Sequence, residues 1–247
     1  MQLTHAVKQL GTETAFKVLA KAKTLEAQGK DIVHLEIGQP DFPTPENISA
    51  AGKQAIDDGW TSYGPTCGQP DFRELIADHI SRTRQIDVKG SQVVVTPGGK
   101  PVMFYTILSV VEAGDEVVYP DPGFPIYKSL IDFAGGKGLP LPLIEENDFS
   151  FDVEKLKELV SDKTKLLIIN SPQNPTGGVL KKEDLKAIAE LCVKHDVIIL
   201  TDEIYSELLY DDTFESITQF EGVMERAVIL DGFSKTYSMT GWRLGYG

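Results

Sequence analysis

Short apolar runs alternate with amphipathic stretches along most of this chain. We expect strands at residues 93–95, 116–119, 139–143, 165–170, 197–201 and 227–230. The stretches between them have helical spacing, and we expect helices at 100–111, 125–133, 153–160 and 181–194. Strands that alternate with helices of this length indicate an α/β domain with a largely parallel sheet. The unbroken apolar run at 166–169 is typical of a sheet that is covered on both faces.

The first 90 residues have a different pattern, with helical stretches and no clear alternation of strands. We expect helices at 14–28, 46–58 and 71–84, and an apolar run at 32–37 that leads into a loop. Asp71 followed by Glu74 has the spacing of a capping box, which predicts that the third helix begins at Asp71.

Composition and charge narrow the function classes. The chain has 247 residues, 41% of them hydrophobic, and a formal net charge of −13. Nucleic-acid binding needs clustered Lys and Arg, so this charge argues against a nucleic-acid partner. We find no apolar run of the length that a membrane span needs, and expect no membrane association. Cys67 and Cys192 lie far apart without a metal-binding spacing, so a reducing cytoplasm is the expected location.

The residues after the predicted strands are the place to look for chemistry, because ligands of α/β sheets bind beyond the carboxyl ends of the strands. Gly98 and Gly99 stand between a strand and a helix, where backbone N–H groups can approach an anion, although glycines there also form ordinary turns. Asn174 lies in a loop rich in Pro and Gly, just after the strand expected at 165–170. Neither a GxGxxG nor a Walker motif is present, so dinucleotide and P-loop binding are not supported.

Two further strand ends carry ionisable residues. Asp202 ends an apolar strand and Tyr205 follows it by one helical turn; the acid is either a helix cap or a functional group. Lys235 follows the last strand among small, hydroxyl and aromatic residues, where desolvation would make its amine nucleophilic. Arg243, eight residues later, has the planar fork that binds phosphate.

Together these strand ends supply a lysine, an acid, a phenol, an amide, an arginine and a glycine-rich anion site. A cofactor with an aldehyde, a ring nitrogen, a phenolic oxygen and a phosphate would use all of them. Pyridoxal phosphate has these four groups, so we expect it as the cofactor.

Six motifs, in order, resemble those of the class I/II aminotransferases, which have the fold type I of pyridoxal-phosphate enzymes. The matching stretches are Gly38-Gln39-Pro40-Asp41-Phe42, Tyr63-Gly64-Pro65, Thr96-Pro97-Gly98-Gly99-Lys100, Asn174-Pro175-Thr176-Gly177, Asp202-Glu203-Ile204-Tyr205 and Ser234-Lys235 through Arg243-Leu244-Gly245-Tyr246. They extend from residue 38 to the end of the chain.

The resemblance implies roles around the cofactor ring. Lys235 matches the lysine that binds the cofactor covalently and moves the proton. Asp202 matches the acid that keeps the pyridine nitrogen protonated, and Tyr205 and Asn174 match the groups that bind the phenolic oxygen. Phe124 falls where the family stacks an aromatic ring on the pyridine.

The resemblance also implies a phosphate site. Arg243, Gly99, Lys100 and Ser234 match positions that contact the phosphate. Tyr63 matches a tyrosine that reaches the phosphate of the neighbouring subunit, which implies a homodimer with shared active sites.

For the substrate, the resemblance implies contacts from Gly38, Phe124 and Asn174, and transamination between an L-amino acid and a 2-oxo acid. Other fold type I enzymes, such as carbon–sulfur lyases and decarboxylases, share the same lysine, acid and arginine and remain an alternative. An inactive cofactor-binding fragment is a further alternative.

The family fold implies a three-layer α/β/α large domain with a mostly parallel seven-stranded sheet. We expect this domain at residues 46–247, with residues 1–45 contributing to a smaller domain that is incomplete here. The family chain normally continues past this point with an arginine that binds the substrate carboxylate. We therefore expect an N-terminal fragment that is a poor catalyst, and an α-helix near 14–28 with an exposed apolar stripe.

Overall fold

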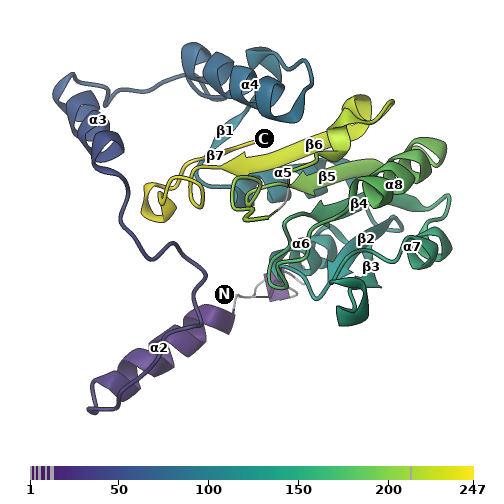
Figure 1. The fold of residues 1–247 in the computed structure, drawn as a ribbon, viewed down its shortest axis with the longest axis horizontal. Helices are drawn as coiled ribbons and strands as arrows, with labels where there is room; N and C mark the ends of the chain where they lie inside the picture. Colours follow the sequence, from purple (N-terminus) through teal and green to yellow (C-terminus); the bar gives the residue numbers. More distant parts are fainter. Residues whose placement is uncertain (1, 3, 5–6, 9, 12–13, 212) are drawn as a thin grey trace.

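A seven-stranded sheet forms the centre of the molecule in the computed structural model, which describes residues 2, 4, 7–8, 10–11, 14–211 and 213–247. The strand order is β1-β7-β6-β5-β4-β2-β3 (Figure 1). The strands are β1 (Val95–Thr96), β2 (Glu116–Asp121), β3 (Lys137–Pro142), β4 (Thr164–Asn170), β5 (Ile198–Asp202), β6 (Ala227–Gly232) and β7 (Gly245–Tyr246).

The five strands from β6 to β3 pair in parallel, whereas β7 is antiparallel to both β6 and β1. The expectation of a mostly parallel seven-stranded sheet is therefore confirmed. The sequence pattern predicted six of these strands and missed β7, which has only two residues and no apolar run. The strand expected at 93–95 is displaced, because pairing with β7 begins at Val95.

Helices cover both faces of the sheet, which confirms the three layers. On one face, α7 (Val153–Leu159) and α8 (Lys182–Lys194) pack on alternate residues of β2, β4 and β5. On the other face, α5 (Lys100–Val110) and α6 (Ile126–Ala134) pack on the intervening residues of these strands and on Leu230 of β6. Each central strand thus contributes apolar side chains to two cores, as its unbroken hydrophobic sequence predicted.

A third apolar cluster lies beside β7, where α4 (Pro70–Arg84) packs against Val93, Ile229 and Tyr246. The capping box predicted for α4 is wrong. The helix begins at Pro70, and its N-cap residue Gln69 makes no side-chain capping bond. Proline suits this position, because its φ is already helical and the N–H that it lacks would have no partner within the helix.

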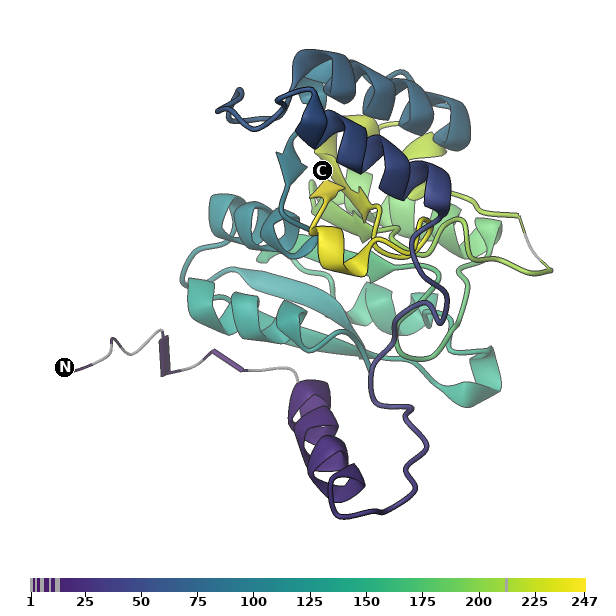
Figure 2. The ribbon, with the colours of Figure 1, turned by 90° about the vertical axis from the view of Figure 1, so that its left-hand side faces the viewer.

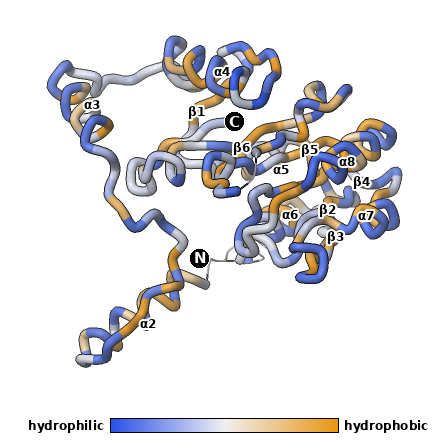
Figure 3. The backbone as a smooth tube through the Cα atoms, viewed as in Figure 1, coloured by the Kyte–Doolittle hydropathy of each residue, from blue (hydrophilic) through white to orange (hydrophobic). Residues whose placement is uncertain are grey.

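The first part of the chain lies apart from the sheet. Helix α2 (Thr14–Glu26) projects away from the three layers, and an extended segment without strand pairing leads from it to α3 (Glu46–Asp57) (Figures 1 and 2). Phe16 and Val18 of α2 are more than half exposed, and hydrophobic residues run along this helix in Figure 3. Short 3-10 helices complete the structure at Gly90–Gln92, Glu145–Asn147, Ile217–Gln219, Met224–Arg226 and Thr240–Trp242. Among the described residues, no helix has the length and apolar character that crossing a membrane requires.

Candidate active site

A cavity of about 670 Å³ opens where β4, β5 and β6 end and α5 begins. Segments from the whole chain line it, including the start of α2 and the 36–39 segment. Ten of the eleven site residues that the sequence suggested lie on its wall, and these are Gly38, Gly99, Lys100, Phe124, Asn174, Asp202, Tyr205, Ser234, Lys235 and Arg243. The fold therefore brings together residues that are up to 205 positions apart (38 to 243).

Asp202 ends β5 and places an almost fully buried carboxylate on the cavity wall. Tyr127 of α6 donates a hydrogen bond of 2.5 Å to its Oδ2, and the backbone N–H of Ile204 lies 3.4 Å from its Oδ1. Burial raises the pKa of Asp202 to about 6, although both hydrogen bonds favour the ionised form. A cation in the cavity would oppose the effect of burial and hold this carboxylate ionised.

Asn170, the last residue of β4, organises the loop that carries Asn174. Its Nδ2 donates to the carbonyl of Asp202 at 2.9 Å, and its Oδ1 accepts from the backbone N–H of Asn174 at 2.8 Å. Gln173 ties the same loop to the next one, because its Nε2 donates to the carbonyl of Pro122 at 2.8 Å. The Asn174–Pro175 peptide bond is cis. The side chain of Asn174 is thus carried to the cavity by a loop that hydrogen bonds fix at several points.

The glycines before α5 allow a close approach between two loops. Gly98 has a φ of +88°, and a Cβ at this position would collide with the guanidinium of Arg243. A Cβ on Gly245 would lie 2.6 Å from the carbonyl carbon of Gly98. Gly99 is the N-cap residue of α5, and Gly99, Lys100 and Arg243 all line the cavity. Backbone N–H groups and a guanidinium together form a site suited to a phosphate.

Lys235 also lies on the cavity wall. Its Nζ donates to the carbonyl of Gly38 and is 5.8 Å from the centre of the Tyr205 ring. Burial, together with the charge of Asp202, raises the pKa of Tyr205 to about 12, so this phenol is a hydrogen-bond donor at neutral pH. The amine of Lys235, the phenol and the carboxylate therefore surround one space.

Phe124 and Lys100 lie together on the cavity wall. Lys100 Nζ is 5.7 Å from the centre of the Phe124 ring, a cation–π distance. The edge of the Phe124 ring also packs on Tyr127, with ring centres 5.8 Å apart and planes at 81°. Tyr127 therefore helps to fix the Phe124 ring, and Phe124 also borders the cavity.

Tyr63 is the one suggested cofactor residue that does not line the cavity, and its side chain is fully exposed. Its expected contact is with a neighbouring subunit, so a position on the surface of the single chain agrees with that expectation and does not test it.

Sequence reasoning missed Tyr127, the main partner of Asp202. It lies in the helix expected at 125–133, and its ring is fully buried. A tyrosine one helical turn after Phe124 was the available signal.

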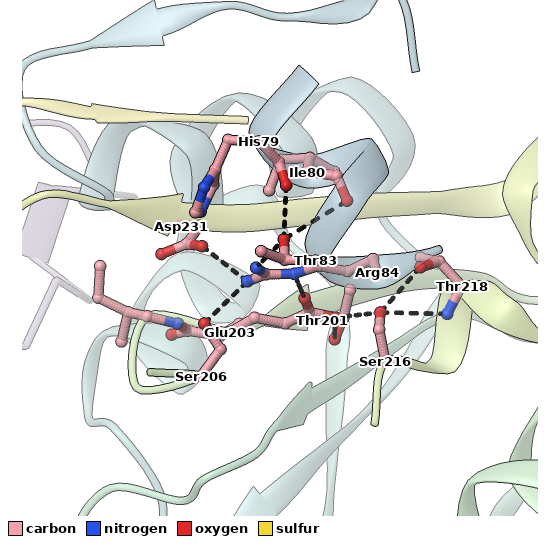
Figure 4. Close-up of polar contacts among 12 residues, drawn as sticks. His79, Ile80, Thr83, Arg84, Thr201, Glu203, Ser206, Ser216, Thr218 and Asp231 are labelled. Carbon is pink, nitrogen blue, oxygen red and sulfur yellow. Dashed lines mark hydrogen bonds and ion pairs between the residues drawn. The ribbon is translucent and has the colours of Figure 1, made fainter. Parts of the chain in front are cut away.

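A buried ionic network around Arg84 was also missed (Figure 4). The guanidinium of Arg84, at the end of α4, contacts Glu203 at 3.0 Å and Asp231 at 2.8 Å, and all three side chains are almost fully buried. Glu203 also accepts a 2.6 Å hydrogen bond from Ser216. Burial raises the pKa of Asp231 to about 7, while the charge of Arg84 opposes this rise. Glu203 directly follows Asp202 at the end of β5, and Asp231 lies near the end of β6. The network therefore joins the ends of these two strands.

Comparison with known proteins places this arrangement in a family. The family model described as aminotransferase class I and II matches residues 30–247. The chain belongs to the class I and II aminotransferases. It is 43% identical over 230 residues to an aspartate aminotransferase of Pyrococcus abyssi, covering 92% of this chain and 59% of that one. It is 39% identical over 248 residues to an aspartate aminotransferase of Bacillus subtilis, covering 100% and 63%.

A solved aspartate aminotransferase of Thermus thermophilus with maleate superimposes with a TM-score of 0.96 at 36% identity, covering 100% of this chain and 64% of that one. The chain thus spans about 60% of the length of these aminotransferases. The family and the fold type that the sequence motifs indicated are confirmed.

Proposed function

We propose that this protein is a pyridoxal-phosphate-dependent aminotransferase that moves an amino group between an L-amino acid and a 2-oxo acid. One observation carries the proposal: a single cavity is bordered by the Lys235 amine, the Asp202 carboxylate and the anion site of Gly99 and Arg243. The family is defined by chemistry that needs these three groups around one cofactor.

The residues of this chain fit pyridoxal phosphate. Asp202 is a buried acceptor whose pKa is raised by burial, and a protonated ring nitrogen beside it would oppose that rise. Gly98 forms part of a cradle that a Cβ would fill. Phe124 offers a ring on the cavity wall for stacking. These groups would hold the ring nitrogen, the phosphate and one ring face.

When bound, pyridoxal phosphate supplies an electron sink for the charge left at the α-carbon of an amino acid. The residues of this chain would orient the cofactor and the substrate and hold them in place. Asp202 would keep a positive charge at the ring nitrogen, and Tyr205 and Asn174 would donate hydrogen bonds to the phenolic oxygen. The Lys235 amine, which lies on the cavity wall, would take a proton from the substrate α-carbon and hold it for return. Gly38 and Asn174, which line the cavity, would contact the substrate carboxylate.

The experiment is amino-group transfer by the cofactor-loaded protein, measured over single turnovers because we expect this chain to be a poor catalyst. We expect aspartate or phenylalanine to be converted to its 2-oxo acid, and 2-oxoglutarate then to be converted to glutamate. Aspartate and aromatic amino acids are the first choices, because relatives at 43% and 42% identity are named as aspartate and aromatic-amino-acid aminotransferases. Lys235→Ala is the control and should abolish the transfer. Release of carbon dioxide or sulfide without glutamate would contradict the proposal and favour a decarboxylase or a lyase.

We further propose that the active unit is a cytoplasmic homodimer. The fully exposed Tyr63 supports a site shared between subunits, and the unpaired cysteines Cys67 and Cys192 suit a reducing compartment. We propose that residues 46–247 form the large domain and that residues 1–45, some of which lie outside the described residues, belong with a smaller one. The projecting position of α2 supports this division (Figure 1). Light scattering of the wild type and of Tyr63→Ala, together with cofactor affinity, tests the shared site.

A further inference from the structure

The hydroxyl of Thr44 connects two parts of the chain that border the cavity from opposite ends of the sequence. Its Oγ1 donates to the backbone carbonyl of Ser238 at 2.6 Å, and it accepts from the indole Nε1 of Trp242 at 3.1 Å. Both hydrogen-bonding directions of one hydroxyl are therefore used, across 194 and 198 positions of sequence.

The Ser238 end of this contact controls the turn that carries Lys235. The backbone N–H of Ser238 donates to the carbonyl of Lys235, which closes a turn directly after the lysine. Ser238 has a φ of +51°, in the left-handed region that a serine rarely adopts. Thr44 binds the carbonyl of this unfavourable residue and so helps to hold the turn in place.

The Trp242 end of the contact leads to the phosphate site. Trp242 directly precedes Arg243, which has a φ of +54° and whose guanidinium packs against Gly98. On its other side the indole lies against α3, where a Cβ built on Gly52 would be 2.6 Å from a ring carbon. The indole is thus held between Gly52 and Thr44, and the backbone that follows it directs Arg243.

A second contact joins the same two segments. Lys235 Nζ donates to the carbonyl of Gly38, six residues before Thr44. The 38–44 segment is therefore fixed to the 235–243 loop at both of its ends, once by the lysine and once by the threonine. A cofactor held by Lys235 would compete with Gly38 for the amine, whereas the hydrogen bonds of Thr44 would remain between the two segments.

We propose that Thr44 is a positioning residue for the cofactor: through Ser238 and Trp242 it holds Lys235 and Arg243 at the spacing that the aldehyde and the phosphate of one ligand require. The proposal rests on the proposed function, since it concerns pyridoxal phosphate as the ligand. It assigns a role to a residue that lies outside the cavity wall and contacts no cofactor group itself.

The test compares Thr44→Val with Thr44→Ser. Valine has nearly the same shape but no hydroxyl, whereas serine keeps the hydroxyl and loses only a methyl group, so it is the matched control. Pyridoxal phosphate is titrated into the cofactor-free protein, and the fraction bound to Lys235 is trapped with borohydride. We expect about tenfold weaker binding for Thr44→Val, which loses both hydrogen bonds of the hydroxyl, and near wild-type binding for Thr44→Ser.

A second readout needs no cofactor. The chain has two tryptophans, and Trp60 is exposed on the surface, so Trp60→Phe leaves Trp242 as the sole indole. In that background, Thr44→Val should shift the emission of Trp242 and Thr44→Ser should not. Thermal unfolding midpoints within a few degrees of one another show that the variants are folded.

Unchanged emission with Thr44→Val would overturn the contact on which the proposal depends. Cofactor affinity within twofold of the wild type, or an equal loss with Thr44→Ser, would overturn the positioning role of the hydroxyl. If the wild type bound no cofactor at Lys235, the proposed function would fail and the positioning role with it. The emission shift would then still report whether the Thr44–Trp242 contact exists, so the two failures are distinguishable.

Discussion

Replacing Asp202 by asparagine should make the cofactor-free protein more stable while it weakens the cofactor site. Asp202 is 4% exposed, and burial raises its pKa from 3.8 to about 6. A carboxyl whose pKa is higher in the folded than in the unfolded state destabilises the fold once it ionises. Below pH 3.8 the carboxyl does not change the free energy of unfolding. As the pH rises toward 6 it lowers that free energy, and above pH 6 the reduction is constant.

The magnitude follows from these two pKa values. The difference of about two pKa units corresponds to about 3 kcal/mol at pH 8, because each unit is worth about 1.4 kcal/mol. Asparagine removes the buried charge, but it weakens the hydrogen bond from Tyr127, which costs about 1 kcal/mol. We therefore expect Asp202→Asn to raise the free energy of unfolding by about 2 kcal/mol at pH 8, with a clearly smaller gain at pH 5.

The assay is urea unfolding of the cofactor-free wild type and variant at pH 5 and pH 8. Asp162→Asn, at an exposed turn position, is the matched control and should change little at either pH. In the loaded enzyme the same Asp202→Asn change should lower the rate by about 10²–10³, because an amide cannot keep the ring nitrogen protonated. A variant that is no more stable than the wild type at pH 8, or whose gain is the same at both pH values, would refute this reasoning.

Three further predictions concern the groups around Asp202 and the anion site. Tyr127→Phe removes a donor that favours the ionised form of Asp202, so the fall in cofactor affinity at acid pH should begin about one pH unit higher, as measured by titration between pH 5 and 8. Gly98→Ala should weaken the binding of pyridoxal phosphate by about 10- to 100-fold through collision with the guanidinium, whereas Gly114→Ala, also at positive φ but in open space, should lose only stability. Arg84→Met leaves two buried carboxylates without their cation and should lower the free energy of unfolding by about 3–5 kcal/mol in urea; a loss below 1 kcal/mol would show that the network carries little charge.

The parts of the fold that depend on local pattern were predictable. The strands β4, β5 and β6 contain unbroken apolar runs, and α8 between β4 and β5 repeats apolar residues at helical spacing. Residues that follow such strands meet at one edge of a parallel sheet, which is why Asp202 and Lys235 could be assigned to one site before their positions were known.

The parts that depend on pairing between distant segments were not predictable. The two-residue strand β7 exists because it pairs with β6 and β1, and nothing in Gly245 and Tyr246 alone indicates a strand. Arg84 meets Glu203 and Asp231 across 119 and 147 positions, a pairing that has no local signature. The start of α4 was mispredicted because Pro70 determines it more strongly than the capping pattern that follows.

The central claim is that Lys235 and the groups around it form one pyridoxal-phosphate site. Borohydride reduction of the protein with pyridoxal phosphate, followed by peptide mapping, tests this most directly. We predict a single label, on Lys235, that is lost when inorganic phosphate competes for the site of Gly99 and Arg243. A label on another cavity lysine such as Lys100, or labelling spread over surface lysines and indifferent to phosphate, would contradict the account.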